Sequence, residues 1–216
     1  MSLPIAKTAA GLGAVSGVSG LGYLAAKNFP SGEDNRSTIS KLFSEQGRTL
    51  LTKGNDTDQW NSRWSEYSKE NKDIWNLKDS TTGTAPNSFI EKCISNSQSK
   101  VSGIEDKLYL EVVKYCSKDF TMEALVGENS GIELLNTAND QDTAGWAAAW
   151  KNYLRDNGTN GNPWNVTGWE SAKGESSTPP SDFRTKCGNK KSEKAYGSKD
   201  SKFKNFSDWC TKAKAT

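Results

Sequence analysis

Two stretches of the chain carry three aromatic residues at positions i, i+4 and i+7, a spacing that places them on one face of a helix. They are Trp60, Trp64 and Tyr67 in the first stretch and Trp146, Trp150 and Tyr153 in the second. Such a stripe can serve as a ligand platform, but Arg63, Glu66 and Lys69 occupy the other faces of the first helix, which favours burial of the rings. The pattern predicts two amphipathic helices whose aromatic faces belong to a core.

Further hydrophobic stripes at helical spacing contain the four cysteines. They are Phe89, Ile90, Cys93 and Ile94, then Leu108, Val112, Tyr115 and Cys116, then Phe183 and Cys187, and finally Phe203, Phe206, Trp209 and Cys210. Weaker helical patterns begin at Thr38 and Thr121. Residues 76–88 and 155–182 are rich in Gly, Ser, Thr, Asn and Pro and are expected to form exposed loops. The chain is therefore expected to be mainly α-helical.

The same motifs occur twice in the same order. In each copy the aromatic stripe is followed by a Trp-Asn pair, then by the motif Phe-(x)2-Lys-Cys, and then by a second cysteine after 22 intervening residues. This order indicates a duplicated module whose length changes are confined to its loops. We expect a leader at 1–27, a polar spacer at 28–37, a helical module 1 at 38–118 and a helical module 2 at 119–216.

The leader has the length of a membrane span. Residues 8–26 carry no charge and lie between Lys7 and Lys27, and a helix of that length covers about 28 Å, close to the thickness of a bilayer's hydrocarbon core. Five glycines make the segment only modestly apolar and disfavour a buried helix of a soluble domain. We expect an uncleaved single-pass anchor in the cell membrane; the alternative is a cleaved signal peptide, which would leave the protein secreted.

Composition narrows the range of functions. Hydrophobic residues make up 33% of the chain, so a thin core must draw heavily on its eight tryptophans. The chain contains no histidine, which excludes Ser-His-Asp and Cys-His catalysis and most catalytic zinc sites. Composition does not exclude catalysis by carboxylates. The obvious candidate is Asp58, but the second copy has Ala144 at the corresponding position, which weakens that candidate. We predict a protein that is not an enzyme, with no catalytic, cofactor-binding or metal-binding residues, and a net charge of +2 is too small to make nucleic acid an expected partner.

Four cysteines permit three pairings. Because a module that folded before its duplication must have satisfied its cysteines internally, the retained spacing favours the bridges Cys93–Cys116 and Cys187–Cys210. Free buried thiols are an alternative. A four-thiolate metal site is disfavoured, since structural zinc sites use cysteine pairs that lie two to four residues apart. Disulfides require an oxidising compartment, so both modules are expected to be extracytoplasmic.

Two sets of side chains are candidates for contact with a partner. Trp75, Trp164 and Trp169 lie in or beside the predicted loops and are the best candidates for exposed aromatic contacts, although packing against the cysteine-bearing helices is the favoured interpretation. The second copy also carries a lysine cluster: Lys186, Lys190, Lys191, Lys194, Lys199, Lys202 and Lys204. The cluster is interpreted as a solvated surface, with binding of a polyanion, either a glycan or nucleic acid, as the alternative.

The glycine-rich leader, the Pro/Gly spacer, the spaced tryptophans and the paired cysteines together resemble large paralogous families of uncharacterised membrane-associated proteins of haemotropic mycoplasmas, which live attached to red blood cells. The resemblance covers the whole chain in style, and none of its motifs is a catalytic signature. It implies a surface-exposed protein that serves host attachment or antigenic variation, with a host cell-surface component as partner, and it assigns no binding residue.

Overall fold

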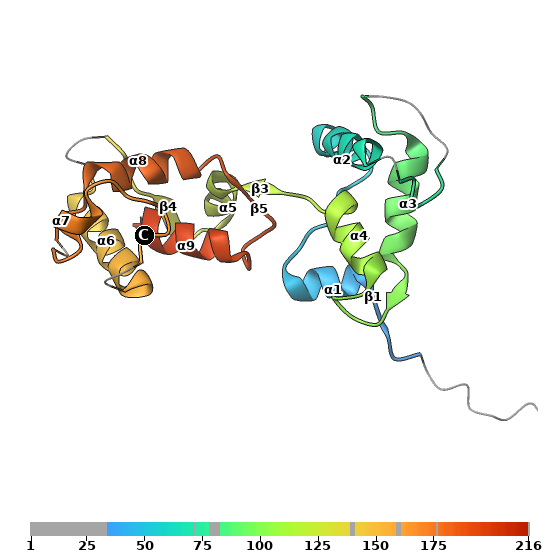
Figure 1. Ribbon diagram of the computed structural model, residues 1–216, viewed down its shortest axis with the longest axis horizontal. Helices are drawn as coiled ribbons and strands as arrows, with labels where there is room; N and C mark the ends of the chain where they lie inside the picture. The colour runs from blue at the N-terminus through green and yellow to red at the C-terminus, as the bar shows by residue number, and fades with distance from the viewer. Residues whose placement is uncertain are drawn as a thin grey trace, which may run out of the picture. The chain divides into compact units, whose positions relative to one another are not determined.

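The computed structural model describes residues 34–70, 72–77, 83–138, 141–158, 161–175 and 177–215. Nine helices lie within these ranges, and the fold is mainly α-helical, as expected (Figure 1). The leader, on which the anchor prediction depends, lies outside the described residues. None of the helices in the described ranges combines the length and the apolar character needed to span a bilayer.

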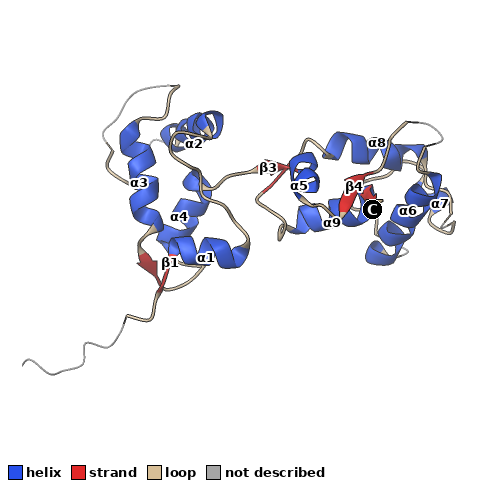
Figure 2. Cartoon of the chain, turned by 180° about the vertical axis from the view of Figure 1, so that it is seen from behind, coloured by secondary structure: helices blue, strands red, loops and turns tan. Residues whose placement is uncertain are grey.

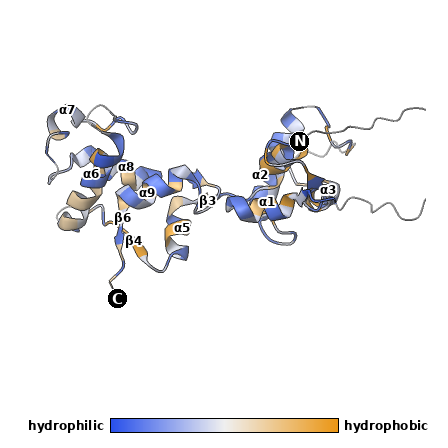
Figure 3. Cartoon of the chain, turned by 90° about the horizontal axis from the view of Figure 1, so that it is seen from below, coloured by the Kyte–Doolittle hydropathy of each residue, from blue (hydrophilic) through white to orange (hydrophobic). Residues whose placement is uncertain are grey.

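Residues 36–118 form the first half of the described chain and contain four helices and one two-stranded sheet. The elements are β1 (Ser37–Thr38), α1 (Ile39–Gln46), α2 (Thr57–Lys69), α3 (Asn87–Ser97), β2 (Lys100–Val101) and α4 (Lys107–Cys116). Strands β1 and β2 pair antiparallel, with Ser37 opposite Val101. Helix α1 carries both hydrophobic and hydrophilic residues (Figure 3). Its buried residues are Ile39 and Phe43.

The core of the first half is a cluster of aromatic rings around Phe89 of α3. The ring centroid of Phe89 lies 6.1 Å from that of Trp60, 5.2 Å from that of Trp64 and 5.4 Å from that of Tyr67. All three rings of the predicted α2 stripe are buried. The prediction that this stripe belongs to a core is confirmed.

Residues 119–215 form the second half, with five helices and two two-stranded sheets (Figure 2). The elements are β3 (Phe120–Thr121), α5 (Met122–Glu128), β4 (Ile132–Leu134), α6 (Thr143–Asn157), α7 (Trp169–Ala172), α8 (Ser181–Lys190), β5 (Lys194–Ala195), α9 (Ser201–Cys210) and β6 (Thr211–Ala213). Strand β3 pairs with β5 and β4 with β6, both antiparallel. A second aromatic cluster surrounds Phe183 of α8, whose ring centroid lies 5.0 Å from that of Trp150 and 5.3 Å from that of Tyr153.

Both predicted disulfides are present. Cys93 of α3 is bonded to Cys116 at the end of α4, with 5.6 Å between the Cα atoms. Cys187 of α8 is bonded to Cys210 at the end of α9, with 5.5 Å between the Cα atoms. Each bridge therefore joins two helices within one aromatic core.

An aspartate directly before each aromatic helix makes the same contacts in the two halves. Asp56 accepts a hydrogen bond from the backbone N–H of Thr52 and pairs with Lys118 at 2.8 Å. Asp142 accepts from the backbone N–H of Asn136 and pairs with Lys212. Both aspartates have a positive φ, 48° and 53°. Neither aspartate side chain caps the helix that follows it. Their carboxylates instead hold the loop that precedes the helix.

The hydrophobic pattern of the sequence predicts a longer helix from Thr38 than the structure contains, since α1 ends at Gln46. Gly47 adopts the left-handed conformation, with a φ of 68°, and its N–H closes the last turn of α1. Leu50, which fits the same hydrophobic pattern, instead pairs with Ser117 in a β-bridge. Leu134 in the second half likewise lies in β4, outside the helix predicted from Thr121.

Candidate functional site

Two of the three tryptophans named as candidates for exposed contacts are buried, which rules out that role for them and agrees with the favoured interpretation that they pack in the core. Trp75 is 8% exposed, and its ring centroid lies 5.9 Å from that of Phe89. Its indole N–H donates to Glu111 at 2.9 Å. Trp169 is 6% exposed and packs against Trp150 with centroids 5.7 Å apart. The reason is compositional: a core with few aliphatic residues relies on these large rings, so both side chains pack inward.

Trp164 is half-buried and lies between the core and a lysine. Its ring centroid is 4.8 Å from that of Trp209. The ammonium of Lys190 lies 5.0 Å from the Trp164 centroid, within the range of a cation–π contact. Trp164 therefore packs against the cysteine-bearing helices, as the favoured interpretation of the sequence predicted, and Lys190 lies over the ring.

The lysine cluster carries less free charge than its sequence suggests. Lys186 pairs with Asp182 at 4.0 Å, Lys190 with Glu193 at 3.1 Å and Lys191 with Glu123 at 3.5 Å. Lys199 donates to the backbone carbonyl of Glu45 at 2.7 Å.

Within the described part of the chain, Lys194, Lys202 and Lys204 are exposed and have no carboxylate partner. Lys202 and Lys204 are two positions apart on α9, so their side chains leave the helix in roughly opposite directions. The structure thus does not gather the seven lysines into one dense patch.

The perturbed carboxylates are explained by structural contacts. The hydrogen bond from Lys212 and the backbone N–H of Asn136 lower the pKa of Asp142. The backbone N–H of Thr167 lowers the pKa of Asp182. Burial raises the pKa of Tyr67 to about 12, with a further contribution from its hydrogen bond to Asp73. The two carboxylate pKa shifts follow from contacts that hold a loop or a helix end, and the pKa shift of Tyr67 follows mainly from burial.

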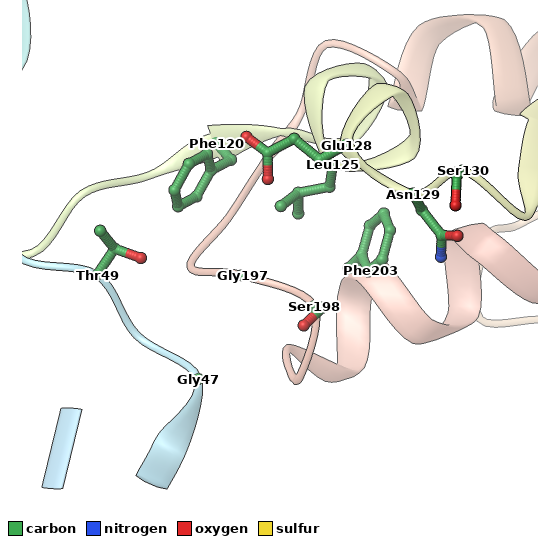
Figure 4. Close-up of a pocket in the computed structure, with 10 residues that line it drawn as sticks. All are labelled: Gly47, Thr49, Phe120, Leu125, Glu128, Asn129, Ser130, Gly197, Ser198 and Phe203. Atoms are coloured by element: carbon green, nitrogen blue, oxygen red, sulfur yellow. The ribbon is translucent and has the colours of Figure 1, made fainter. Parts of the chain in front are cut away.

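One hollow, of about 450 Å³, has an apolar side and a polar rim (Figure 4). Phe120, Leu125 and Phe203 form the apolar side, and Glu128 is the charged residue on the rim. Gly47 and Gly197 also line it, and both have a positive φ. No sequence motif marks this hollow, because its lining comes from segments that are far apart in the chain.

A second concave surface lies wholly within the first half, and we name it the α3–α4 groove. It has a volume of about 470 Å³ and is lined by the turn 74–76, by one face of α3 with Lys92 and Asn96, and by the first turns of α4 with Leu108 and Glu111. Sequence reasoning used Lys92 only as a part of the Phe-(x)2-Lys-Cys motif and did not single out Asn96. The signal available was a difference after the two Phe-(x)2-Lys-Cys motifs, where Asn96 follows the first motif and Lys190 follows the second at the same distance.

No group of three or more Cys, Asp and Glu side chains within the described ranges is arranged to hold a metal ion. The chain matches no protein-family model, no curated protein and no solved structure.

Proposed function

We propose that this chain is a membrane-anchored surface protein without catalytic activity, in which two copies of one disulfide-bridged helical module face the outside of the cell. Residues 8–26 supply the anchor, and the modules serve attachment to a host cell-surface component or antigenic variation. The observation that carries the proposal is the pair of buried disulfides, one in each aromatic core.

The disulfides support an extracytoplasmic location because such bonds form and persist in oxidising compartments. Matched contacts support a common origin of the two halves. Trp60 Nε1 donates to the carbonyl of Thr52, and Trp146 Nε1 donates to that of Asn136. In both halves a tyrosine hydroxyl accepts the backbone N–H of a tryptophan. Because these matched hydrogen bonds stabilise the cores, the surface residues of the two halves can differ without loss of the fold.

Surface proteolysis of intact cells that produce the full chain tests the location. We expect protease to degrade the residues after the leader on intact cells, and deletion of residues 8–26 to release the protein from the membrane fraction. A cytoplasmic marker protein serves as the control for cell integrity. Protection of the chain on intact cells, with digestion only after permeabilisation, would contradict the proposal.

Polyanion binding is the second candidate, and it is favoured by the exposed ammonium groups of Lys194, Lys202 and Lys204, which pair with no carboxylate of the described residues. Binding of that kind weakens steeply with salt because counterions are released. The test is retention of the protein on heparin across a salt series, with these three lysines changed to Glu. A matched variant changes Lys41, Lys53 and Lys107, which are exposed lysines of the first half. We expect weak retention that is equal in both variants; tight retention abolished only by the first variant would instead establish polyanion binding.

A further inference from the structure

We propose that the α3–α4 groove binds a carboxylate attached to an apolar group, and specifically the carboxyl terminus of a peptide that ends in a residue such as leucine. The groove offers a buried amide, an ammonium that has no ion pair among the described residues and an apolar wall on one concave surface. This inference goes beyond the proposed cellular location and does not depend on it.

The amide belongs to Asn96, which is 6% exposed. Its Nδ2 is buried and has no hydrogen-bond acceptor among the described residues. A buried donor without an acceptor costs about 1–3 kcal/mol, so native structures rarely contain one without a reason. Asn96 is one of the residues that line the groove. A ligand oxygen in the groove would supply the acceptor.

The ammonium belongs to Lys92, which lies one helical turn before Asn96 and therefore on the same face of α3. Lys92 is half-buried and makes no ion pair with any described carboxylate. Two donors on one face, one of them charged, suit the two oxygens of a carboxylate.

The other charges of the groove are already compensated. Glu111 accepts from the Trp75 indole at 2.9 Å and lies 3.8 Å from Lys107. Asp106 accepts from the backbone N–H of Ser102 and of Leu108, and the charge of Arg36 helps to lower its pKa. Lys92 is thus the cation left for a ligand.

The apolar wall is formed by Ile74 and Leu108 beside Trp75. Ile74 is 38% exposed, one of four large hydrophobic side chains of the described residues that are left open to solvent. A volume of about 470 Å³ lies within the range of small-ligand sites. The side chain of a carboxyl-terminal leucine would cover Ile74 while its carboxylate reached Lys92 and Asn96.

The corresponding side chains of the second half have partners of their own. Lys186 corresponds to Lys92 and pairs with Asp182, whereas the first half has Ser88 at the position of Asp182. Lys190 corresponds to Asn96 and lies over the ring of Trp164. Two substitutions between the halves therefore leave both donors free in the first half alone.

The probe is N-acetyl-glycyl-leucine with a free carboxylate, titrated against the full chain and followed by saturation-transfer NMR of the ligand. We expect a Kd of about 0.1–1 mM, as for a ligand of this size. The carboxyl-terminal amide should bind about tenfold more weakly or worse, as for loss of a hydrogen bond to a charged group. 4-Methylpentanoate keeps the carboxylate and the branched chain but lacks the peptide group, and we expect weaker binding.

The variant Ser88→Asp gives Lys92 the partner that the second half has, and it should weaken binding of the acid about tenfold. Ser88 is exposed in the first turn of α3, where a carboxylate favours the helix, so this variant keeps the fold. Lys186→Gln is the matched control in the second half and should leave the Kd unchanged.

Equal binding of the acid and the amide, or an unchanged Kd in Ser88→Asp, would overturn the carboxylate site. Equal binding of 4-methylpentanoate and the dipeptide would overturn the assignment to a peptide terminus.

Discussion

At the scale of single residues, the described chain concentrates its packing on a few aromatic side chains. Phe89 and Phe183 each lie at the centre of a ring cluster, and each cluster includes rings from several helices and loops. Each large ring removes much more surface from water than an aliphatic side chain does. Loss of one ring should therefore affect stability more than loss of any aliphatic side chain.

The first prediction concerns Trp150, which is 0% exposed. Trp150→Ala should lower the free energy of unfolding by about 3–5 kcal/mol, because it removes a large buried ring and leaves a cavity. The measurement is urea unfolding followed by circular dichroism. Ile94→Ala is the control, since Ile94 is 42% exposed and its loss should cost no more than about 0.5 kcal/mol. Equal losses in the two variants would contradict the burial of Trp150.

The second prediction concerns Tyr67, whose pKa burial raises to about 12. The folded state favours the neutral phenol, so its contribution to stability is complete below the unfolded pKa of about 10 and is lost as the pH rises toward 12. The free energy of unfolding should therefore fall between these values. Absorbance of tyrosinate should show a phenol that ionises near pH 12 in the parent and is missing in Tyr67→Phe; full ionisation of every tyrosine by pH 11 would be inconsistent with this.

At the scale of elements, each disulfide fastens a helix end to a neighbouring helix. The bridge Cys93–Cys116 closes a loop of about 24 residues, for which the chain-entropy model gives roughly 3 kcal/mol of stability. The bridge Cys187–Cys210 closes a loop of the same length.

The third prediction is that Cys93→Ala combined with Cys116→Ala lowers the free energy of unfolding of the first half by about 2–4 kcal/mol and leaves that of the second half unchanged. Thermal unfolding of the double variant measures the loss, and the pair Cys187→Ala with Cys210→Ala is the reciprocal control. Non-reducing peptide mapping of the parent should recover only the two bridges within the halves. A bridge between Cys93 and Cys187 would contradict the structure.

The helices that carry the aromatic stripes and the cysteines could be predicted from the sequence, because their hydrophobic residues recur at the helical period and the same residues are buried in the structure. The short strands could not. Strands β1 and β2 have two residues each, too few to show a period of two, and their pairing is set by tertiary contacts. Leu50 and Leu134 continue a helical hydrophobic pattern but lie beyond the end of their helices, and only Gly47 marks one of these ends.

At the scale of the whole molecule, residues 36–216 form one unit that contains two separate clusters of buried residues. The first cluster extends from Ile39 to Cys116 and the second from Met122 to Cys210. Each cluster has its own disulfide, so damage to one core need not propagate to the other.

The fourth prediction follows from these separate cores. Trp60→Ala should unfold the first half at a lower temperature while the second half keeps the parental transition, so calorimetry should resolve two transitions. Limited proteolysis between the two transitions should leave a fragment that contains Cys187 and Cys210. A single transition that shifts as a whole would show that the two cores unfold together.

The candidate groove shows why sites are harder to predict than folds. Its donors, Lys92 and Asn96, are ordinary polar residues in a helical sequence pattern, and nothing in the local sequence shows that they lack partners among the described residues. Their significance depends on Ser88 and on the turn that carries Ile74, and only the folded structure brings these elements together. The lysine cluster was conspicuous in the sequence, yet the structure pairs three of its members with carboxylates.

The tyrosine hydroxyl at the end of each aromatic stripe accepts a hydrogen bond from a later tryptophan, and the length of chain between the two residues differs between the halves. Tyr67 receives the N–H of Trp75 eight residues later, whereas Tyr153 receives that of Trp164 eleven residues later. The same kind of hydrogen bond thus joins residues that are eight positions apart in the first half and eleven positions apart in the second. Insertions and deletions between the two hydrogen-bonded residues can change the length of the intervening segment without disturbing the core. Related proteins could therefore differ at the surface and keep the same fold.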